Sequence, residues 1–495
     1  MTAYNLRFVI AALLVTASLW LVYTLKGATE IDILSPEPDT KIVNGNADQA
    51  LSHWDLKPHG LRDLSPTAEI STLYLQAVSS STRDFDLIEE IDTELPPFAH
   101  LEEQDNGQAS PFEVRSLNIP SIPPRADASS VIFGVATTLD RLEDSLEAFA
   151  YWAAGTGTTI VALVSPPDAS SQSNTPTSSQ LQKKAHSLDL NLVIHESPHD
   201  YITRYITLLS LLHDQATSTP STTWASIIDD DTFFPSTTRL THMLNNYNAS
   251  QPQYIGGLTE DLAAIEEWGY LAYGGAGIFL SVPLLTQLQP HLETCLNFNI
   301  VSGDGKLGEC IYRYTTTKLS VERGLNQLDL FGDHTGFYEA VRPLPVSVHH
   351  WKSWGRYDML RTSAVARITG ADSILQKFHL RDDWWMTHGF SIVKYSDEDD
   401  EALDGSDGSS AITDSKYLTH RQGAMERTFT DPGRTTDRSF LHSLEPLRPK
   451  DEGKIQYLIE SAVEENSNTM SLYYVKRVDG VGKSVIRVIW TRVGG

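Results

Sequence analysis

The sequence predicts an α/β protein with a mixed, mostly parallel sheet, helices on both faces and a β-rich C-terminal extension. From Val131 onward, short apolar runs typical of buried strands alternate with segments whose apolar residues recur at helical spacing. A strand, helix, strand order gives parallel strands joined by crossover helices. Later apolar runs near Phe390–Tyr395, Ser471–Arg477 and Ser484–Arg492 predict further strands.

Each element of the α/β region rests on its own pattern. Val131–Ala136 is a continuous apolar run, and Leu142, Leu146, Phe149 and Trp152 then recur at helical spacing. The same alternation continues through strands at 159–165, 190–195 and 224–228 and helices at 180–188 and 201–213. Ligands of such sheets bind beyond the carboxyl ends of the strands.

Composition excludes several classes of protein. The 495 residues include 64 acidic and 38 basic side chains, a net charge of −26, so a nucleic-acid partner is not expected. A hydrophobic content of 40% with ten tryptophans excludes a wholly disordered chain. Two cysteines exclude a disulfide-dense scaffold and a cysteine-rich zinc module.

The N-terminus predicts membrane attachment. Phe8–Leu25 contains no charged residue and would form about 27 Å of helix, close to the hydrocarbon thickness of a bilayer. A cleaved signal peptide is the alternative, because Ala17 and Ser18 are small, but bulky Leu19 and Trp20 follow at once. We therefore expect an uncleaved signal anchor at 1–26, with the remainder of the chain in the lumen of the Golgi or endoplasmic reticulum.

Three further segments are expected. Residues 27–130 are rich in proline and acidic residues and predict a largely disordered stem, in which Thr67–Ser79 is a candidate docked helix. The catalytic domain is expected at 131–355 and the β-rich extension at 356–495. Within the extension, the acidic stretch 396–410 lacks the ligand spacing of a calcium loop and indicates a solvated insertion. Asn248 begins a sequon for N-glycosylation.

Three carboxylates follow the strand that ends at Ile228. Asp229, Asp230 and Asp231 would repel one another at the edge of the sheet, and a divalent cation relieves such repulsion. Hard oxygen ligands suit Mn²⁺ or Mg²⁺, which also bind diphosphates. The alternative is a plain acidic loop in an acidic protein.

Two later motifs also carry candidate site residues. The glycines of Tyr273–Ser281 are typical of places where a backbone approaches a ligand, although turns explain many glycine clusters. Asp304 precedes a predicted helix, where it is either a cap or a general base. His349 and His350 are either metal ligands or aromatic cover over the sheet edge.

The order of these motifs resembles the Fringe-like glycosyltransferases of family 31, especially their plant and fungal relatives. The motifs are DDD at 229–231, YIGG at 254–257, GGAGIFLS at 274–281, GDGKLGEC at 303–310 and SVHHW at 347–351, with QLDLFGD at 327–333 before the histidine pair. The resemblance spans about Val131–Trp354. It implies a GT-A fold and metal-dependent, inverting transfer from UDP-sugars.

The resemblance also implies a role for individual residues. Asp231 matches the direct metal ligand, assisted by Asp229, and His350, with His349 as the alternative, matches the ligating histidine. Asp304 matches the base that deprotonates the acceptor hydroxyl. Donor-binding positions correspond to Asp229, Asp230, Thr137, Thr138, Arg141, Gly274, Gly275 and Gly277.

The sequence departs from the resembled family at two places and agrees with it in a pair of cysteines. Glycines flank Asp304 where animal relatives have two adjacent acids, and Trp351 and Lys352 stand where many relatives have an aliphatic and an acidic residue. Cys295 and Cys310 match paired cysteines of close relatives, which implies a disulfide of about 3 kcal/mol in an oxidising lumen. Two buried thiols are the alternative in a cytosolic domain.

The expected function follows from these assignments. The chain would transfer a hexose or N-acetylhexosamine from a UDP-sugar to a hydroxyl of a glycan or glycoprotein, forming a β-1,3-type linkage. A non-catalytic lumenal binding protein that retains the fold is the alternative. A metal-dependent hydrolase is less well supported, because the chain has no nucleophile elbow, HExxH motif or Walker loop.

Overall fold

The computed structural model describes residues 61–80, 86–100, 114–123, 125–166, 175–330, 334–340, 342–395 and 454–493. The predicted signal anchor, the first part of the predicted stem and the acidic insertion 396–410 lie outside these residues. Within them, no helix has the length and apolar character that a membrane span requires.

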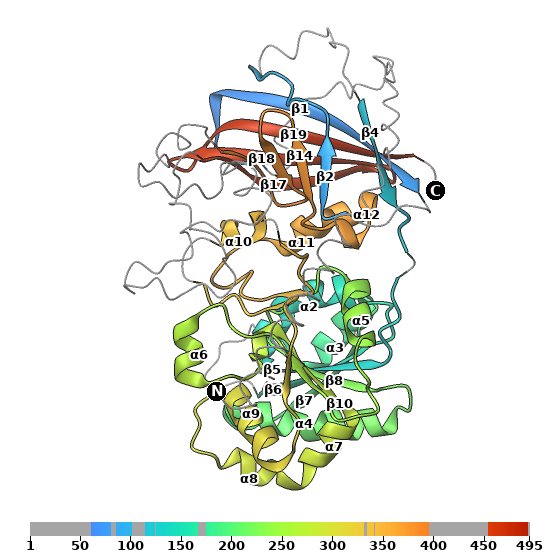
Figure 1. Cartoon of the computed structure of the whole chain (residues 1–495), viewed down its shortest axis with the longest axis vertical. Helices are drawn as coiled ribbons and strands as arrows, with labels where there is room; N and C mark the ends of the chain where they lie inside the picture. The colour runs from blue at the N-terminus through green and yellow to red at the C-terminus, as the bar shows by residue number, and fades with distance from the viewer. Residues whose placement is uncertain are drawn as a thin grey trace, which may run out of the picture. The chain divides into compact units, whose positions relative to one another are not determined.

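A seven-stranded mixed sheet forms the α/β region, drawn in cyan to yellow in Figure 1. Its strands are β5 (Val131–Thr138), β6 (Thr159–Ser165), β7 (Asn191–Glu196), β8 (Trp224–Ile228), β9 (Tyr254–Gly256), β10 (Ile278–Ser281) and β11 (Leu319–Val321). Their order is β11-β9-β10-β8-β5-β6-β7, and only β10 runs antiparallel to its neighbours. The prediction of a mostly parallel sheet is confirmed.

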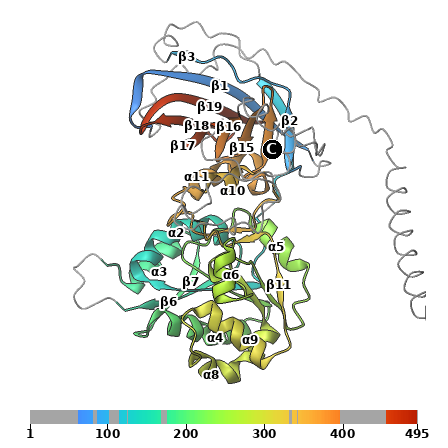
Figure 2. The same ribbon diagram turned by 60° about the vertical axis from the view of Figure 1, so that its left-hand side comes forward.

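Helices cover both faces of this sheet, because successive side chains of its strands point to opposite sides. Phe133 of β5 belongs to one buried apolar cluster and Ile132 to the other. The first cluster includes α2 (Leu139–Ala153), α3 (Ser178–Ser187) and α5 (Thr237–Asn245). The second includes α4 (Tyr201–Ser218), α7 (Val282–Leu288), α8 (Leu292–Leu296) and α9 (Gly303–Tyr314); Figure 2 shows α4, α8 and α9 grouped together.

A ten-stranded sheet joins segments from both ends of the described chain. Figure 1 shows blue β1 alongside red β19, with which it pairs in parallel. Its strands are β1 (Leu64–Ser80), β2 (Ile88–Ile91), β3 (Ala99–His100), β4 (Val114–Pro120), β14 (Lys377–Leu380), β15 (Trp384–Thr387), β16 (Ser391–Tyr395), β17 (Lys454–Asn466), β18 (Thr469–Val478) and β19 (Val481–Val493). The β-rich character predicted for the C-terminal part is confirmed.

This sheet corrects the predicted stem. Much of 61–130 is not a disordered tether but contributes four strands to the sheet, and the candidate helix at Thr67–Ser79 is part of β1. Leu73, Leu75 and Ala77 are buried at a spacing of two, which is the period of a strand. One partner of β1 is β19, about 400 residues away in the sequence, so no local pattern indicated that pairing. The expected boundary at 130 therefore does not separate a disordered stem from the folded part of the chain.

Short elements connect the two sheets in sequence. In α5, Arg239 donates hydrogen bonds to the carbonyl oxygens of Pro345, Ala371 and Ile374, which fixes the chain on both sides of residue 355. The remaining elements are α6 (Leu262–Trp268), η3 (Gly274–Ala276), η4 (Gln289–His291), β12 (Leu325–Asn326), α10 (Thr335–Glu339), β13 (Ser347–Val348), α11 (Met359–Thr362), η5 (Ser363–Val365), α12 (Ala366–Thr369) and η6 (Ala371–Ser373).

Candidate active site

The three aspartates after β8 differ in their burial and in their partners, although Asp229 and Asp231 share His349. The turn that holds them is tied to the glycine motif: Thr232 Oγ1 accepts from the Asp229 N–H (3.0 Å) and donates to the Gly275 carbonyl (2.8 Å). Asp230 and Asp231 are buried, whereas Asp229 is about a quarter exposed, with a side chain at 28%.

Asp230 is held by groups from the end of β5 and the start of α2. Arg141 grips its carboxylate with two hydrogen bonds, Nε to Oδ2 (2.7 Å) and Nη2 to Oδ1 (2.6 Å), and the Thr137 hydroxyl also donates to it. The carboxylate in turn raises the pKa of Arg141 above its ordinary value. Thr138 caps α2 by accepting from the Arg141 N–H (3.4 Å). Two predicted donor-binding positions, Thr137 and Arg141, therefore contact Asp230, and Thr138 supports them as the cap of α2.

Asp231 lies between the two histidines that follow β13. Its Oδ1 is 2.9 Å from His349 Nε2, and its Oδ2 is 3.8 Å from His350 Nδ1. Ligand atoms of these three residues all lie within 4.8 Å of one another, which is the spacing of a possible metal site. Although burial raises the pKa of Asp231, the hydrogen bonds with His349 and His350 hold that pKa well below its usual range.

His349 is oriented as a metal ligand would be. Its Nδ1 is 3.0 Å from the Gln327 carbonyl oxygen, which can only accept, so Nδ1 carries a proton. Its Nε2 faces Asp231 and also lies 3.4 Å from Asp229 Oδ2. Burial lowers the pKa of His349, but the two carboxylates outweigh it and raise that pKa to about 10. A cation, either a proton or a metal ion, is therefore favoured beside Nε2, and these residues fit Mn²⁺ or Mg²⁺.

His350 is bonded at both ring nitrogens. Nε2 lies 3.2 Å from Asp329 Oδ1, and Nδ1 lies 3.0 Å from the Ser353 hydroxyl, which donates to Asp231 Oδ2 (2.7 Å). Trp354 stacks on the ring, with centroids 3.9 Å apart and planes 11° apart. Both histidines belong to the site. In His349 the Nε2 atom faces only the aspartates, whereas both ring nitrogens of His350 bond to Ser353 and Asp329.

The glycines of the Tyr273–Ser281 motif leave space that neighbouring side chains of the site occupy. A β-carbon on Gly275 would come within 2.1 Å of His349 Cε1, and one on Gly274 within 2.8 Å of the Tyr205 hydroxyl oxygen. Gly277 has a φ of 95°, a conformation that L side chains rarely adopt. The glycine before Asp304 has a similar reason, because a β-carbon on Gly303 would come within 2.5 Å of Tyr205 Cγ.

Asp304 lies in the first turn of α9, beside the glycine motif. Ser302, not Asp304, is the N-cap residue of the helix and accepts from the Gly305 N–H (3.2 Å). The carboxylate accepts from the Gly274 N–H (Oδ2, 3.2 Å) and from the Gly305 N–H (Oδ1, 2.8 Å). Burial raises its pKa despite these bonds, and the negative charge of Asp229 adds to the rise. A carboxyl with a raised pKa near other acids is suited to proton transfer.

Several site residues were not predicted from the sequence. The Tyr201 hydroxyl donates to Asp229 Oδ1 (3.1 Å) from the first turn of α4, and no motif marks it. Gln327 and Asp329 belong to the QLDLFGD stretch that carries the resemblance, and they support His349 and His350. Phe331 to Asp333 of that stretch lie outside the described residues.

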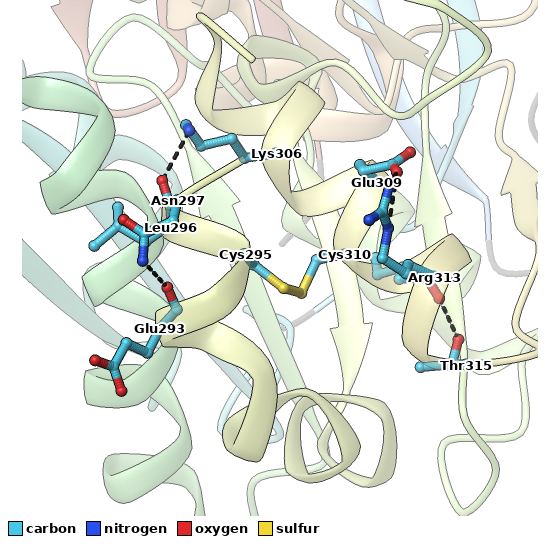
Figure 3. The surroundings of a disulfide bond; sticks show 10 residues. Glu293, Cys295, Leu296, Asn297, Lys306, Glu309, Cys310, Arg313 and Thr315 are labelled. Carbon is cyan, nitrogen blue, oxygen red and sulfur yellow. Dashed lines mark hydrogen bonds and ion pairs between the residues drawn. A yellow bond between two sulfur atoms is a disulfide. The ribbon is translucent and has the colours of Figure 1, made fainter. Parts of the chain in front are cut away.

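The predicted disulfide is confirmed. Figure 3 shows the bridge between Cys295 on α8 and Cys310 on α9, whose Cα atoms are 5.5 Å apart. Beside it, Lys306 donates to the carbonyl oxygen of Leu296 (2.8 Å), which adds a second link between α9 and the segment before it. Asn248 is exposed, as glycosylation of its sequon requires, and its Oδ1 accepts from the Ser250 hydroxyl (2.7 Å).

Comparison with known proteins gives a family match over part of the chain. Residues 268–380 match the family described as "Protein of unknown function, DUF604", a range that includes Asp304 and both histidines. The chain is also 36% identical over 90 residues to the chondroitin sulfate glucuronyltransferase of Homo sapiens. That match covers 18% of this chain and 11% of the relative, so the chain spans only a small part of the relative's length.

Solved structures with a partial likeness include three glycosyltransferases. A mannosyltransferase of Pyrobaculum calidifontis, in complex with GDP-Man and Mn²⁺, has a TM-score of 0.27 and 14% identity, over 40% of this chain and 55% of that one. The apo glycosyltransferase GlyE of Streptococcus pneumoniae has a TM-score of 0.30 and 12% identity, over 45% of this chain and 54% of that one. A glycosyltransferase involved in glycosylation of the major capsid of PBCV-1 has a TM-score of 0.26 and 12% identity, over 45% of this chain and 96% of that one. Scores this low do not bear on the activity.

Proposed function

We propose that this chain is a metal-dependent, inverting glycosyltransferase that moves a sugar from a UDP-sugar to a hydroxyl of a glycan or glycoprotein. The observation that carries the proposal is the cluster of Asp231, which follows β8, with His349 and His350, which follow β13; the separate carboxyl of Asp304 lies close enough for Asp229 to act on it. The first group suits a divalent ion and a diphosphate, and the second suits an acceptor hydroxyl. The partial likeness to a glucuronyltransferase supports the same class.

The metal site would be formed by Asp231 and His349, with Asp229 and His350 beside them. If a divalent ion were bound there, it would supply positive charge to balance the charge that develops on the leaving diphosphate. The Gln327 carbonyl holds the His349 ring so that Nε2 faces the aspartates. Ser353 and Asp329 hold the His350 ring through its two nitrogens, and Trp354 stacks on that ring.

Asp304 would remove the proton of the acceptor hydroxyl. The oxygen then attacks the anomeric carbon as the bond to the diphosphate breaks, with inversion at that carbon. The N–H groups of Gly274 and Gly305 hold the carboxylate in place, and burial raises its pKa toward the range that suits a general base. We extend the proposal to a β-1,3-type linkage and to a hexose or N-acetylhexosamine donor, following the resemblance to family 31.

The cellular setting is part of the proposal. The disulfide and the exposed sequon at Asn248 support an oxidising, lumenal compartment. With the apolar stretch Phe8–Leu25 as a signal anchor, the chain would be a single-pass type II protein of the Golgi or endoplasmic reticulum membrane.

Binding of nucleotide tests this proposal without knowledge of the acceptor. Purified full-length chain is titrated with UDP in Mn²⁺ and again in EDTA, beside the Asp231→Asn variant. We expect binding to the wild type in Mn²⁺ only, and little binding to the variant. Wild type that binds UDP equally well in EDTA contradicts the metal site. Metal-dependent UDP binding without transfer to any acceptor would favour the non-catalytic binding protein.

A further inference from the structure

A lysine after the histidine pair reaches back to helix α2. Lys352 Nζ donates to Ser145 Oγ (2.8 Å), and Ser145 Oγ donates to the Arg141 carbonyl one turn earlier in the helix (2.6 Å). Lys352 is half-buried, whereas Ser145 is fully buried. The ammonium group is close enough to the Arg141 guanidinium, Asp230 and Asp231 for their charges to act on it.

This ammonium group has no counter-charge of its own within the described part of the chain. Asp230, Asp231 and Asp144 act on it through space, but none of the three makes an ion pair with it among the described residues. Its one hydrogen-bond partner is a neutral hydroxyl, which leaves two of its three N–H donors available. A partly buried charge without an ion-pair partner is unfavourable, so binding of an anionic ligand beside the Lys352 ammonium would be favourable.

Arg141 supplies a second positive charge beside it. The guanidinium uses Nε and Nη2 on Asp230, and its side chain is still 60% exposed. Arg141 and Lys352 are thus two cationic groups beside the aspartates that follow β8, and a diphosphate would bring complementary negative charge to them.

We propose that Lys352 and Arg141 form a clamp for the diphosphate of a nucleoside diphosphate sugar, with Lys352 contacting the phosphate oxygens directly. This inference rests on the proposed function, and it names the part of the donor that this pair of residues recognises.

Lys352 could otherwise act only as a tether between its loop and α2. Three variants separate the two roles. Lys352→Met removes the charge and the tether, Ser145→Ala removes only the partner of the tether, and Lys352→Arg keeps the charge. Affinities for UDP and for uridine are measured by calorimetry on the purified full-length chain in Mn²⁺, because uridine lacks the phosphates.

The clamp predicts a loss that is specific to phosphate. Lys352→Met is expected to weaken UDP binding about tenfold or more while uridine binding stays within about twofold of wild type. Ser145→Ala should bind UDP nearly as the wild type does, and Lys352→Arg should recover most of the loss. Unchanged UDP affinity in Lys352→Met, or an equal loss in Ser145→Ala, overturns the clamp. Wild type that does not bind UDP in Mn²⁺ instead refutes the proposed function itself.

Discussion

The imidazole of His349 lies directly against the backbone of Gly275. A β-carbon at Gly275 would be 2.1 Å from His349 Cε1 and 2.2 Å from its Nδ1, closer than real contacts permit. Both neighbours are fixed, because the Gln327 carbonyl holds the ring and Thr232 holds the Gly275 carbonyl. The glycine is thus a steric requirement of the histidine's position.

Gly275→Ala should therefore displace His349 and damage the metal site more than the fold. We expect Mn²⁺-dependent UDP binding to fall at least about tenfold, with a loss of stability of roughly 1–3 kcal/mol from overpacking. Gly308→Ala on α9 is the matched control, since its β-carbon would come no closer than 3.2 Å to Leu271 Cβ. Normal binding in Gly275→Ala would show that His349 does not hold the metal from this position.

The two histidines should differ in their importance for the metal. His349 presents Nε2 to two carboxylates, whereas His350 uses both nitrogens on Asp329 and Ser353. His349→Gln is expected to lose Mn²⁺ binding, measured by electron paramagnetic resonance, by a larger factor than His350→Gln. A larger loss in His350→Gln would restore the sequence-based choice of His350 as the principal ligand.

Asp304→Asn should separate catalysis from binding. Removing a general base costs about 10²–10⁴-fold in rate, while UDP affinity in Mn²⁺ should stay near that of wild type. The wild-type rate should fall as pH decreases through the pKa of Asp304, and burial puts that fall at higher pH than for an ordinary aspartate, above about pH 4. Turnover in Asp304→Asn close to wild type would reject this residue as the base.

The disulfide should stabilise the helix that carries Asp304. Cys295 and Cys310 are fully buried and link α8 to α9. Replacing both by serine should lower the free energy of unfolding by about 3 kcal/mol, as expected for a loop of this length, measured by urea denaturation. Equal stability of the wild type with and without reductant would show that the bridge contributes little.

Glu260 should make stability depend on pH. It is 2% exposed and accepts from the Leu328 N–H (2.6 Å), and burial followed by the charge of Asp329 raises its pKa from 4.5 to about 7. A raised folded-state pKa gives a stabilising contribution that is present below about pH 4.5 and lost as pH rises through about 7. In Glu260→Gln this contribution is absent. Between pH 4.5 and 8, the free energy of unfolding of the wild type should therefore fall relative to that of the variant by on the order of 1–3 kcal/mol.

A difference between wild type and Glu260→Gln that stays constant over this range contradicts the assignment. Comparing the two proteins at each pH is needed because Lys377, also buried, has its pKa lowered by burial to about 7 and titrates in the same range. That contribution is common to both proteins and cancels in the difference.

Local patterns predicted the α/β sheet because its parallel strands are nearly continuous apolar runs. Trp224–Ile228 and Thr159–Ser165 have the predicted bounds, and the aspartates after Ile228 lie at the expected edge. Strand β1 was mistaken for a helix, and its pairing with β19 could not be anticipated because the two segments are remote in the sequence. Tyr201 and Ser353 were missed for a related reason: their roles arise only where the fold places them beside Asp229 and Asp231.

Donor turnover tests the central claim most directly. Purified full-length chain and its Asp231→Asn variant are incubated with a panel of UDP-sugars in Mn²⁺ and in EDTA, and released UDP is measured. The proposed function predicts that the wild type releases UDP from at least one donor in Mn²⁺, and that EDTA or the substitution abolishes the release. Release that persists in EDTA or in Asp231→Asn, or no release from any UDP-sugar in Mn²⁺, would contradict it.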